Sequence, residues 1–483
     1  MSGLTRADFL RGAGAVAASG LLPARAADPR GTEAPLDADV VVIGGGLSGL
    51  TAARELGRRG HTSLVLEARD RVGGRTLSVP TSHGHPVDGG GAWIGPGQDR
   101  MAALAVELGL VTVPSWYAGD TTYDLLGKVT RGMIPDVSWS ESLDALRALW
   151  RLDRLAGSLP QGASWEAADA ARLDALTVHD WLVGRGATPF THAVFKLITR
   201  AVFAGHPEHM SLLWVLHYVG AAGGVLPVIL NDGGAQDLRF EGGSQQVSLG
   251  LAALLGDVVR LAHPVRHVEQ PPGEPVRVHT DGGVLRCRRV VVAMMPGDTM
   301  RIAFTPELPA ARLDLAGGWA RLTRLPLIKT SVLYPRPFWR DRGLSGAMQS
   351  DAAPLQLVFD TSPTDGSLGV LTCFLSVTEA PHLGDARTRP QAVAEELVRY
   401  FGPDAAHPLE VVEKDWGIDP WSTGCITPLP PGLLSRAGHT LRTPVDRVHW
   451  AGTETAHAWC GYMEGAVRAG ERVAAEVHAA LDS

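Results

Sequence analysis

Three glycines near the start of the chain have the spacing of a phosphate-binding loop. Gly44, Gly46 and Gly49 fit the pattern G-x-G-x-x-G, and they follow the apolar run at residues 40–43, which is typical of a buried parallel strand. A second apolar run ends at Glu67, about 20 residues past the glycines, where a carboxylate can accept hydrogen bonds from a ribose. A glycine pattern alone is weak, but strand, glycines, helix, strand and acid in this order predict a dinucleotide-binding site.

Two arginines follow this acid at positions suited to binding an anion. Arg69 lies just after Glu67, and Arg75 follows the glycine pair at residues 73–74. A guanidinium group forms paired hydrogen bonds with phosphate oxygens, and the glycines beside it leave room for a ligand. We therefore expect both arginines to contact the bound dinucleotide.

From this point the chain resembles the flavin monoamine oxidases along nearly its whole length, residues 37–476. The glycine loop and residues 66–76 match the N-terminal signature of that family, and residues 87–96 resemble its next flavin-contacting loop. Residues 240–244 and 264–268 resemble the segments where the chain returns to the cofactor domain, and residues 325–330 and 337–340 resemble the segment that carries the active-site lysine. Residues 416–425, 430–432 and 450–472 match the C-terminal flavin region. The resemblance implies one compact enzyme whose FAD is held by both ends of the chain.

The resemblance implies FAD-binding roles for two groups of residues. The residues that would hold the ADP half of FAD are Gly44, Gly46, Gly49, Glu67, Arg69, Arg75 and Val265. The backbone of Val265 would contact the adenine. Those that would line the isoalloxazine ring are Gly91, Ala92, Trp93, Trp416, Gly452, Thr453, Glu454, Tyr462 and Met463. Cys425 aligns with the cysteine that is thioether-linked to the flavin in the animal enzymes, and a buried unreacted thiol is the alternative.

The resemblance also implies which residues face the substrate. Lys329 and Tyr462 take the catalytic positions: Lys329 would hold a water near flavin N5, and Tyr462 would form one wall of an aromatic cage. The other wall is Ile426 here, which weakens cation–π contact with an amine and widens the pocket. Gln236 and Val202 would complete the substrate-binding surface, and the glycines beside Gln236 show an insertion.

These residue types permit the oxidation of an amine by a flavin. The equivalent of a hydride leaves the amine Cα, and water hydrolyses the resulting imine to an aldehyde or ketone. The amine must react in its neutral form, which apolar and aromatic walls favour because they penalise charge. We therefore predict an FAD-dependent oxidase of a small primary or secondary amine, aromatic or alicyclic, with O2 as the electron acceptor and hydrogen peroxide as the product.

Three alternatives stay open. An L-amino-acid oxidase of the same fold would need an arginine in the pocket for the substrate carboxylate, and no motif fixes one. A nicotine-type amine dehydrogenase would pass its electrons to a cytochrome instead of O2. A flavin-binding protein without turnover would have no use for Lys329 or for a nearly complete flavin face.

Charge and cysteine usage exclude other classes of function. Lys+Arg 44 against Asp+Glu 51 gives a net charge of −7 without a basic block, so nucleic-acid binding is not indicated. The four cysteines are scattered, and no Cys/His cluster predicts a metal site. We expect a small-molecule amine and O2 as partners and no stable membrane anchor, and a homodimer is the assembly to test.

Residues 1–36 are predicted to be an export signal or a disordered tail. Residues 5–11 resemble a twin-arginine motif in which Ala7 replaces the second arginine. An apolar stretch of small residues and the A-x-A sequence at residues 24–26 follow, as in a cleavable signal. This pattern favours export to the periplasm or the cell exterior, and a cytoplasmic location is the alternative.

An α/β (α+β) fold with two interleaved parts must position the candidate residues. A Rossmann-type FAD-binding domain is predicted from three segments, residues 37–112, 241–318 and 419–480. A substrate domain of mixed sheet and helices is predicted from two inserted segments, residues 113–240 and 319–418. Ligands commonly bind at such a domain interface, as the amine oxidase architecture also implies.

Periodicity predicts the main elements of the inserted segments. Helices are expected at residues 143–155, 189–203 and 391–401, and strands at residues 330–334 and 370–376. Trp214 and Tyr218, four apart on one helical face, are expected to be core rather than pocket residues.

Overall fold

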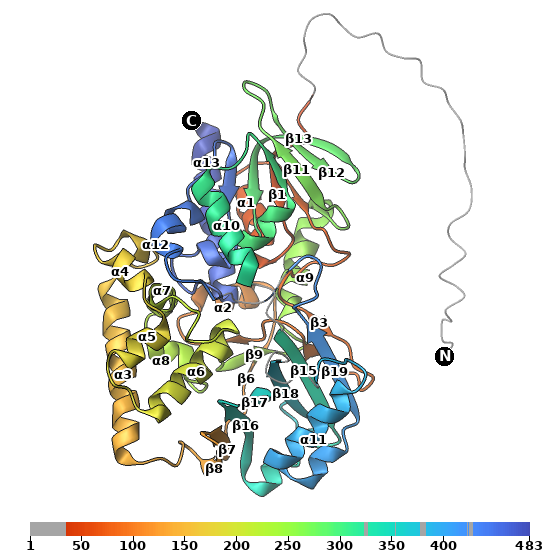
Figure 1. The fold of residues 1–483 in the computed structure, drawn as a ribbon. Coiled ribbons are helices and arrows are strands. Elements are labelled where there is room, and N and C mark those ends of the chain that lie inside the picture. The colour runs from red at the N-terminus through yellow and green to blue at the C-terminus, as the bar shows by residue number, and fades with distance from the viewer. Residues whose placement is uncertain (1–34, 323–326, 353, 377–382, 423, 425–427) are drawn as a thin grey trace, which may run out of the picture. The chain divides into compact units, whose positions relative to one another are not determined.

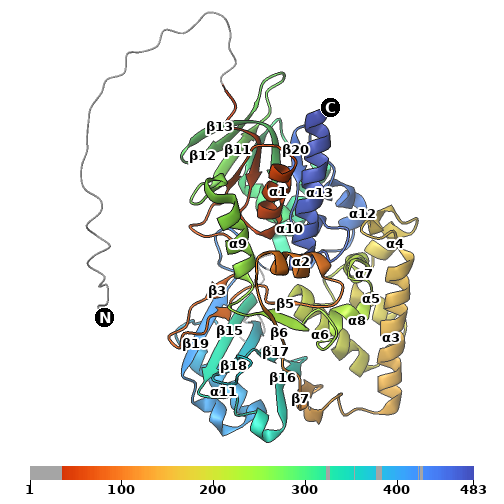
Figure 2. The ribbon, with the colours of Figure 1, turned by 180° about the vertical axis from the view of Figure 1, so that it is seen from behind.

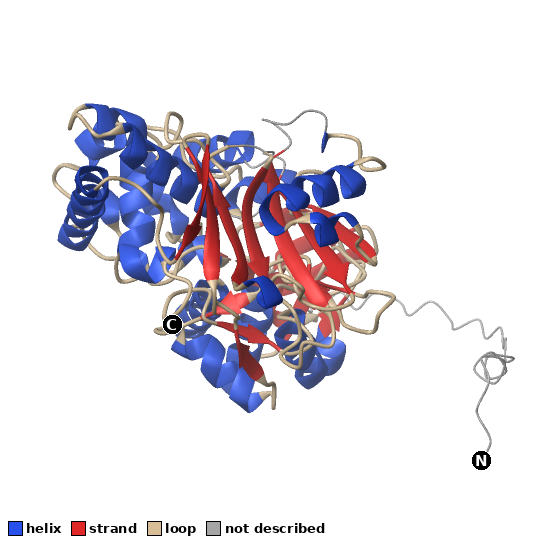
Figure 3. Ribbon diagram, turned by 90° about the horizontal axis from the view of Figure 1, so that it is seen from below, coloured by secondary structure: helices blue, strands red, loops and turns tan. Residues whose placement is uncertain are grey.

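The computed structural model describes residues 35–483, apart from residues 323–326, 353, 377–382, 423 and 425–427. From residue 36 onward the described chain forms one compact unit, in which helices cover two large sheets (Figures 1 and 3). The predicted export signal lies outside the described residues, as do Cys425 and Ile426. Across the described part of the chain, no helix is both long enough and apolar enough to span a membrane.

The first large sheet carries the N-terminal glycine motif. Its order is β10-β2-β1-β13-β12-β11-β14, with β20 paired to β13, and β1, β2, β13 and β20 run parallel. Residues 40–42 in β1 are valines with no exposed surface, as expected of a parallel strand covered on both faces. The strands are β1 (Ala38–Ile43), β2 (Ser63–Leu66), β10 (Val259–Arg260), β11 (Val265–Glu269), β12 (Val276–Thr280), β13 (Gly283–Val292), β14 (Ala303–Thr305) and β20 (Val448–Trp450).

Two helices far apart in the sequence lie side by side on this sheet. They are α1 (Leu47–Arg58) and the C-terminal α13 (Met463–Asp482) (Figure 2). Gly470 allows the close approach, because a Cβ there would lie 2.5 Å from the carbonyl oxygen of Ser48. The other helices around the sheet are α2 (Asp99–Glu107), α9 (Gln245–Leu255) and α10 (Ala310–Leu322), while α12 (Leu434–Ala437) packs with the helices beside the second sheet.

The second large sheet has the order β19-β15-β18-β17-β16-β7-β8. The amphipathic α11 (Arg389–Phe401) buries Val393, Leu397 and Phe401 in the same core as side chains of this sheet. The strands are β7 (Asp120–Leu125), β8 (Lys128–Gly132), β15 (Leu327–Tyr334), β16 (Leu344–Ser350), β17 (Leu355–Asp360), β18 (Gly369–Ser376) and β19 (Glu410–Asp415). The predicted strands and the predicted helix of this region are confirmed, with small shifts in their bounds.

A group of helices packs beside the second sheet (Figure 1). They are α3 (Trp139–Ser158), α4 (Ala170–Asp174), α5 (Val178–Val183), α6 (Pro189–Phe203), α7 (Leu212–Ala221) and α8 (Val225–Ile229). Local signals set their starts: the side chains of Ser138 and Thr188 cap α3 and α6, and Pro189 occupies the first turn of α6. These helices share a core that includes Trp214 of α7.

Short elements connect these layers. The strands are β3 (Ser78–Val79), β4 (Val87–Asp88), β5 (Trp93–Ile94), β6 (Thr112–Pro114) and β9 (Leu238–Phe240). The 3-10 turns are η2 (Ser164–Glu166), η3 (Gly256–Val258), η4 (Pro296–Arg301), η5 (Arg340–Arg342), η7 (Pro403–Ala406), η8 (Gly438–Leu441) and η9 (Thr453–Thr455). The first sheet is mostly parallel and covered by helices, and the second is a mixed sheet with its own helices. This architecture confirms the predicted α/β class.

One buried histidine in α7 should make the stability of the fold depend on pH. His217 stacks on Trp214 and lies 3.0 Å from Ser164 Oγ, and burial lowers its pKa from the usual 6.5 to about 3. In the unfolded chain, His217 binds a proton below about pH 6.5, whereas in the folded chain its imidazole stays neutral down to about pH 3. The free energy of unfolding should therefore decrease as the pH falls from about 6.5 towards 3. We expect His217→Gln to flatten this dependence in chemical denaturation, relative to the exposed control His407→Gln. An unchanged slope would contradict the assignment.

Candidate active site

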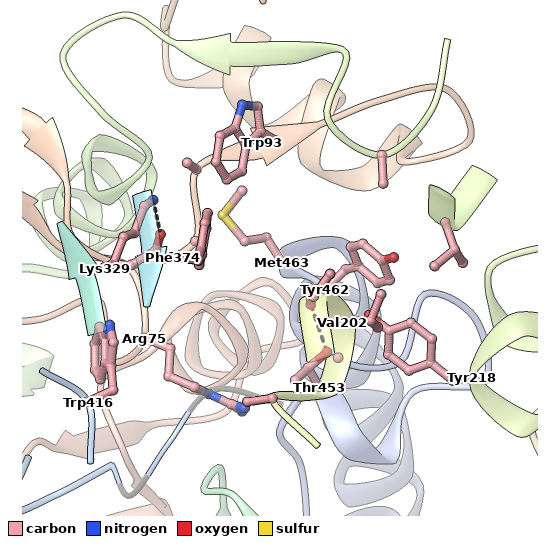
Figure 4. A pocket seen from close by; sticks show the side chains of 18 of the residues that line it. Arg75, Trp93, Val202, Tyr218, Lys329, Phe374, Trp416, Thr453, Tyr462 and Met463 are labelled. Carbon is pink, nitrogen blue, oxygen red and sulfur yellow. Dashed lines mark hydrogen bonds between the residues drawn. The ribbon is translucent and has the colours of Figure 1, made fainter. Parts of the chain in front are cut away.

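A cavity of about 760 Å³ extends from the glycine loop of the first sheet to the helices beside the second sheet (Figure 4). Most of the described candidate residues line it: Gly44, Gly46, Glu67, Arg69, Arg75, Gly91, Ala92, Trp93, Val202, Gln236, Val265, Lys329, Trp416, Gly452, Thr453, Tyr462 and Met463. Two do not, Gly49 and Glu454: Gly49 packs the helix against the strand, as expected of the third glycine of the motif, and Glu454 lies behind the lining. Cys425 and Ile426 fall outside the described residues, so the structure describes neither a flavin linkage nor the aliphatic wall.

At one end of the cavity, the turn from β1 into α1 is shaped for a phosphate. Gly44 has φ +107°, and a Cβ there would lie 2.7 Å from the Ala293 carbonyl oxygen. A Cβ on Gly49 would lie 2.0 Å from the Gly44 oxygen, so Gly49 acts by letting the helix pack onto the turn and not by lining the cavity. Gly46 precedes α1 without any side-chain cap, so no side chain occupies the amides of the first turn. Such a helix N-terminus fits the diphosphate of FAD.

Glu67 lies beside this turn with its carboxylate fixed by the backbone. Its two oxygens accept hydrogen bonds from Gly45 N at 2.7 Å and Arg69 N at 2.9 Å. Val265 lines the cavity as well, on β11 of the same sheet. The donor and acceptor set at this end therefore fits the ribose and adenine of FAD.

Arg69 is held by an acid that the sequence interpretation missed. Its guanidinium lies 2.6 Å from Asp419, which also binds Lys414 at 2.7 Å. Burial alone would raise the pKa of Asp419, but hydrogen bonds from Lys414 and from Trp421 N and the charge of Arg69 lower it to about 2. Asp419 lies inside the C-terminal segment that resembles the flavin region, but Arg69 is 350 residues away, so no local pattern pairs the two.

Arg75 is held by an acid from the C-terminal motif. Its two terminal nitrogens lie 2.6 Å and 3.1 Å from the oxygens of Glu454, so the pair is bidentate. The Glu454 side chain is 5% exposed and lies behind the cavity lining. We therefore correct its role from direct cofactor contact to positioning Arg75.

The middle of the cavity joins the two ends of the chain. Gly452 N donates a hydrogen bond to Ser48 Oγ at 3.0 Å, across 404 residues of sequence. Trp416 Nε1 donates to the Gly89 carbonyl at 2.8 Å, which fixes the indole against the glycine run at residues 89–91. A Cβ on Gly90 would lie 2.0 Å from the Arg75 carbonyl oxygen, so position 90 must be glycine to pass beside the arginine loop. A planar ring system such as isoalloxazine fits between these backbone-lined walls.

Lys329 points into the same part of the cavity from β15 (Figure 4). Its ammonium donates to the Gly90 carbonyl at 2.8 Å and lies 4.8 Å from the ring centroid of Trp93 and 5.6 Å from that of Phe374. Strand pairing explains Phe374, which sits directly opposite Lys329 on β18. The residue is only 4% exposed, so its charge is held by a carbonyl and two aromatic faces in place of solvent.

An acid that the sequence interpretation did not single out lies near Lys329. Asp88 accepts hydrogen bonds from Ser244 N at 2.9 Å and Ser244 Oγ at 3.2 Å. Burial raises the pKa of Asp88, and the Lys329 charge opposes that rise. The single proton of the Ser244 hydroxyl is shared between Asp88 and the Gly91 carbonyl, so Asp88 and Ser244 together hold the loop that carries Gly91.

Tyr462 stands at the boundary between the middle of the cavity and its far end (Figure 4). Its ring lies 5.4 Å from that of Tyr218 and 5.0 Å from that of Trp459, and its backbone oxygen accepts from Thr453 Oγ1 at 2.7 Å. Burial raises the pKa of the Tyr462 hydroxyl to about 12, and a hydrogen bond with Tyr218 opposes the rise. Trp214 is a core residue as predicted, but Tyr218 lines the cavity as well as the core, which corrects the expectation for that residue.

The far end of the cavity is apolar. Segments 123–236 and 349–374 contribute Val202, Phe359 and many other aliphatic and aromatic side chains. The polar side chains among them are tyrosines, Ser142, Asn231, Gln236 and Gln349, and none of the described residues that these segments supply is charged. This end therefore suits a ligand whose body is uncharged.

Comparison with known proteins agrees with this geometry. The family described as flavin containing amine oxidoreductase matches residues 47–478. AofH of Mycobacterium tuberculosis, whose name assigns it to the flavin-containing monoamine oxidases, is 40% identical over 93% of this chain and 98% of its own length. The flavin-containing amine oxidase A of Equus caballus is 38% identical over 92% of this chain and 85% of its own.

Solved structures agree as well. Cyclohexylamine oxidase from Brevibacterium oxydans superimposes with a TM-score of 0.86 and 34% identity, covering 92% of this chain and 100% of that one. Putrescine oxidase bound to putrescine gives a TM-score of 0.85 at 30% identity, covering 92% and 99%. Together with the cavity, these matches show that this chain belongs to the flavin-containing amine oxidase family and is an FAD-dependent enzyme that oxidises amines.

Proposed function

We propose that the substrate is a primary or secondary monoamine with an alicyclic or aromatic body, and that O2 is the electron acceptor, with hydrogen peroxide as product. The observation that carries this proposal is the uncharged far end of the cavity, whose described lining offers apolar walls and a few neutral polar groups. The similarity to cyclohexylamine oxidase supports an alicyclic amine.

The residues of the chain would each do one task in this reaction. FAD, when bound, supplies the acceptor for the hydride equivalent from the amine Cα. The apolar walls favour the neutral amine, because an ammonium ion would lose its hydration there without gaining a partner. The rings of Tyr462 and Tyr218 flank the path of the amine towards the cofactor. The Lys329 ammonium would hold a water at the cofactor side of the cavity.

The same lining argues against two rival substrate classes. An amino acid would need an arginine or lysine for its carboxylate, and a diamine would need an acid for its second ammonium. Among the described residues of the far end, neither kind of side chain is present. We therefore expect weak activity on both classes.

Anaerobic reduction of the flavin tests this proposal. We expect cyclohexylamine or benzylamine to bleach the flavin absorbance with an efficiency at least about 100-fold higher than putrescine or free L-amino acids, since an unpaired buried charge costs several kcal/mol. Faster bleaching by an L-amino acid would overturn the substrate class. If O2 reoxidises the reduced flavin more slowly than the enzyme turns over with cytochrome c as acceptor, the result would instead favour an amine dehydrogenase.

We also propose that the enzyme is exported, that it has no stable membrane anchor, and that it assembles as a homodimer. The proposal of export rests on the twin-arginine-like residues 5–11 and the A-x-A sequence at residues 24–26. Fractionation of cells that express the full chain, with and without Arg6→Lys, would test it. Activity that stays in the cytoplasm with the unaltered chain would contradict export, and light scattering of the purified protein would report the assembly.

A further inference from the structure

Three side chains that commonly bind metals converge outside the active site. His61 lies in the loop between α1 and β2, and His478 and Asp482 lie one turn apart near the end of α13. One nitrogen or oxygen of each lies within 4.8 Å of the others. None of the three lines the active-site cavity, so the function proposed above makes no use of them.

The two imidazoles are hydrogen-bonded to each other, and a small rearrangement would bring the three side chains to metal-ligand spacing. His61 Nε2 lies 2.8 Å from His478 Nδ1, and the same Nδ1 lies 3.3 Å from Asp482 Oδ2. A tetrahedral Zn²⁺ with bonds of about 2.0 Å holds its nitrogen ligands about 3.3 Å apart. The imidazoles would therefore have to separate by about 0.5 Å to admit the ion. The side chains of His478 and Asp482 are 40% and 60% exposed, so they are free to make this adjustment.

Charges of both signs surround the cluster: on the positive side, Arg288 and Arg289 donate to the carbonyls of Leu481 and Ala480 at 3.0 Å and 2.6 Å. Asp39 accepts hydrogen bonds from both Thr62 N and Thr62 Oγ1, which places a second carboxylate next to His61. Asp39 also lies 3.8 Å from Arg288, which balances part of its charge. The partial exposure of the cluster leaves room for water to complete the coordination of an ion.

We propose that His61, His478 and Asp482 form a binding site for a divalent transition metal of the Zn²⁺ type. Two imidazoles and one carboxylate suit Zn²⁺, Ni²⁺ or Cu²⁺ better than Mg²⁺ or Ca²⁺, which prefer oxygen ligands. The histidines are 417 residues apart, which is why their sequence spacing indicated no metal. The bound ion would link the C-terminal end of α13 to the loop after α1. It would thereby stabilise the position of α13, whose N-terminal end follows Tyr462.

A zinc titration of the untagged holoenzyme tests this proposal. After chelator treatment and dialysis, calorimetry at about pH 7.5 should show one equivalent of Zn²⁺ bound. We expect His61→Ala and His478→Ala each to weaken binding by about tenfold or more. The control His407→Ala, which removes an exposed imidazole outside the cluster, should bind as the unaltered chain does. Flavin absorbance checks that each variant is folded.

Two further measurements keep the test independent of folding and of activity. Cu²⁺ bound to the unaltered chain should show two nitrogen ligands in its electron paramagnetic resonance spectrum, and one in either histidine variant. Zinc should raise the melting temperature of the unaltered chain, and it should raise that of the Asp482→Asn variant by less. Because Asp482 is exposed, its replacement should not disturb folding, so a smaller shift would report weaker zinc binding. Zinc affinity that is equal in the unaltered chain and in the double variant of His61 and His478 would overturn the proposal.

Discussion

Replacing Lys329 with methionine should leave FAD bound but slow turnover, or reoxidation of the flavin, by about tenfold or more. The reason is that methionine keeps the length of the side chain and removes the one ammonium that the structure places between Gly90 and the rings of Trp93 and Phe374. Because the charge is buried, its effect on nearby polar groups is stronger than it would be in water. Stopped-flow measurement of flavin reduction and of reoxidation would show which half-reaction is affected.

Lys128→Met is the matched control for this experiment. Lys128 lies on β8 with a side chain that is 64% exposed and pairs with Asp136, so its replacement removes one lysine without touching the cavity. We expect its kinetics to match those of the unaltered enzyme. Unchanged rates in Lys329→Met would remove that lysine from the mechanism and leave the family assignment intact.

Replacing Arg75 with methionine should cause the second large effect, the loss of FAD affinity. The change leaves the carboxylate of Glu454 buried without its bidentate partner, and breaking such a pair costs about 3 kcal/mol or more. FAD should then be lost in gel filtration, and the melting temperature of the remaining protein should fall. The cost arises from the unpaired acid, so Arg75→Met combined with Glu454→Met should recover part of the stability.

Arg58→Met controls for the loss of an arginine. Its side chain is 51% exposed and its ion pairs with Glu55 and Glu107 lie on the surface of α1, so we expect an effect below about 1 kcal/mol. A double variant of Arg75 and Glu454 that is no more stable than Arg75→Met alone would show that the arginine contributes through the cofactor and not through the acid.

Sequence reasoning located the parts of the site that depend on local pattern. The glycine loop, Glu67 and the run of valines in β1 are each defined by residues close together in the chain, so a single segment carries the signal. Lys329 was located by the family resemblance of its strand. The aromatic face of Phe374 beside it follows only from the pairing of β15 with β18, which no local pattern specifies.

The residues that were missed or given another role depend on tertiary contacts. Asp419 meets Arg69 across 350 residues of sequence, and nothing local distinguishes it from a solvated acid. Glu454 resembled a cofactor contact, yet its carboxylate is turned towards Arg75. Tyr218 has the helical spacing of a core residue and is one, but the same ring also faces the cavity because α7 lies at its edge. The helical spacing of apolar residues indicates which face of a helix is buried, but it does not show whether that face meets the core or a cavity.

The central claim is that both ends of the chain enclose one flavin whose reactive edge faces the apolar end of a shared cavity. A crystal structure of the purified holoenzyme with an amine inhibitor tests this most directly. We predict electron density for one FAD with its diphosphate at the N-terminus of α1 and its ring between Trp416 and Tyr462, near Lys329. Density for the inhibitor should lie beyond Tyr462, among the uncharged residues. A colourless protein that does not bind FAD, or a flavin bound anywhere else, would contradict the account.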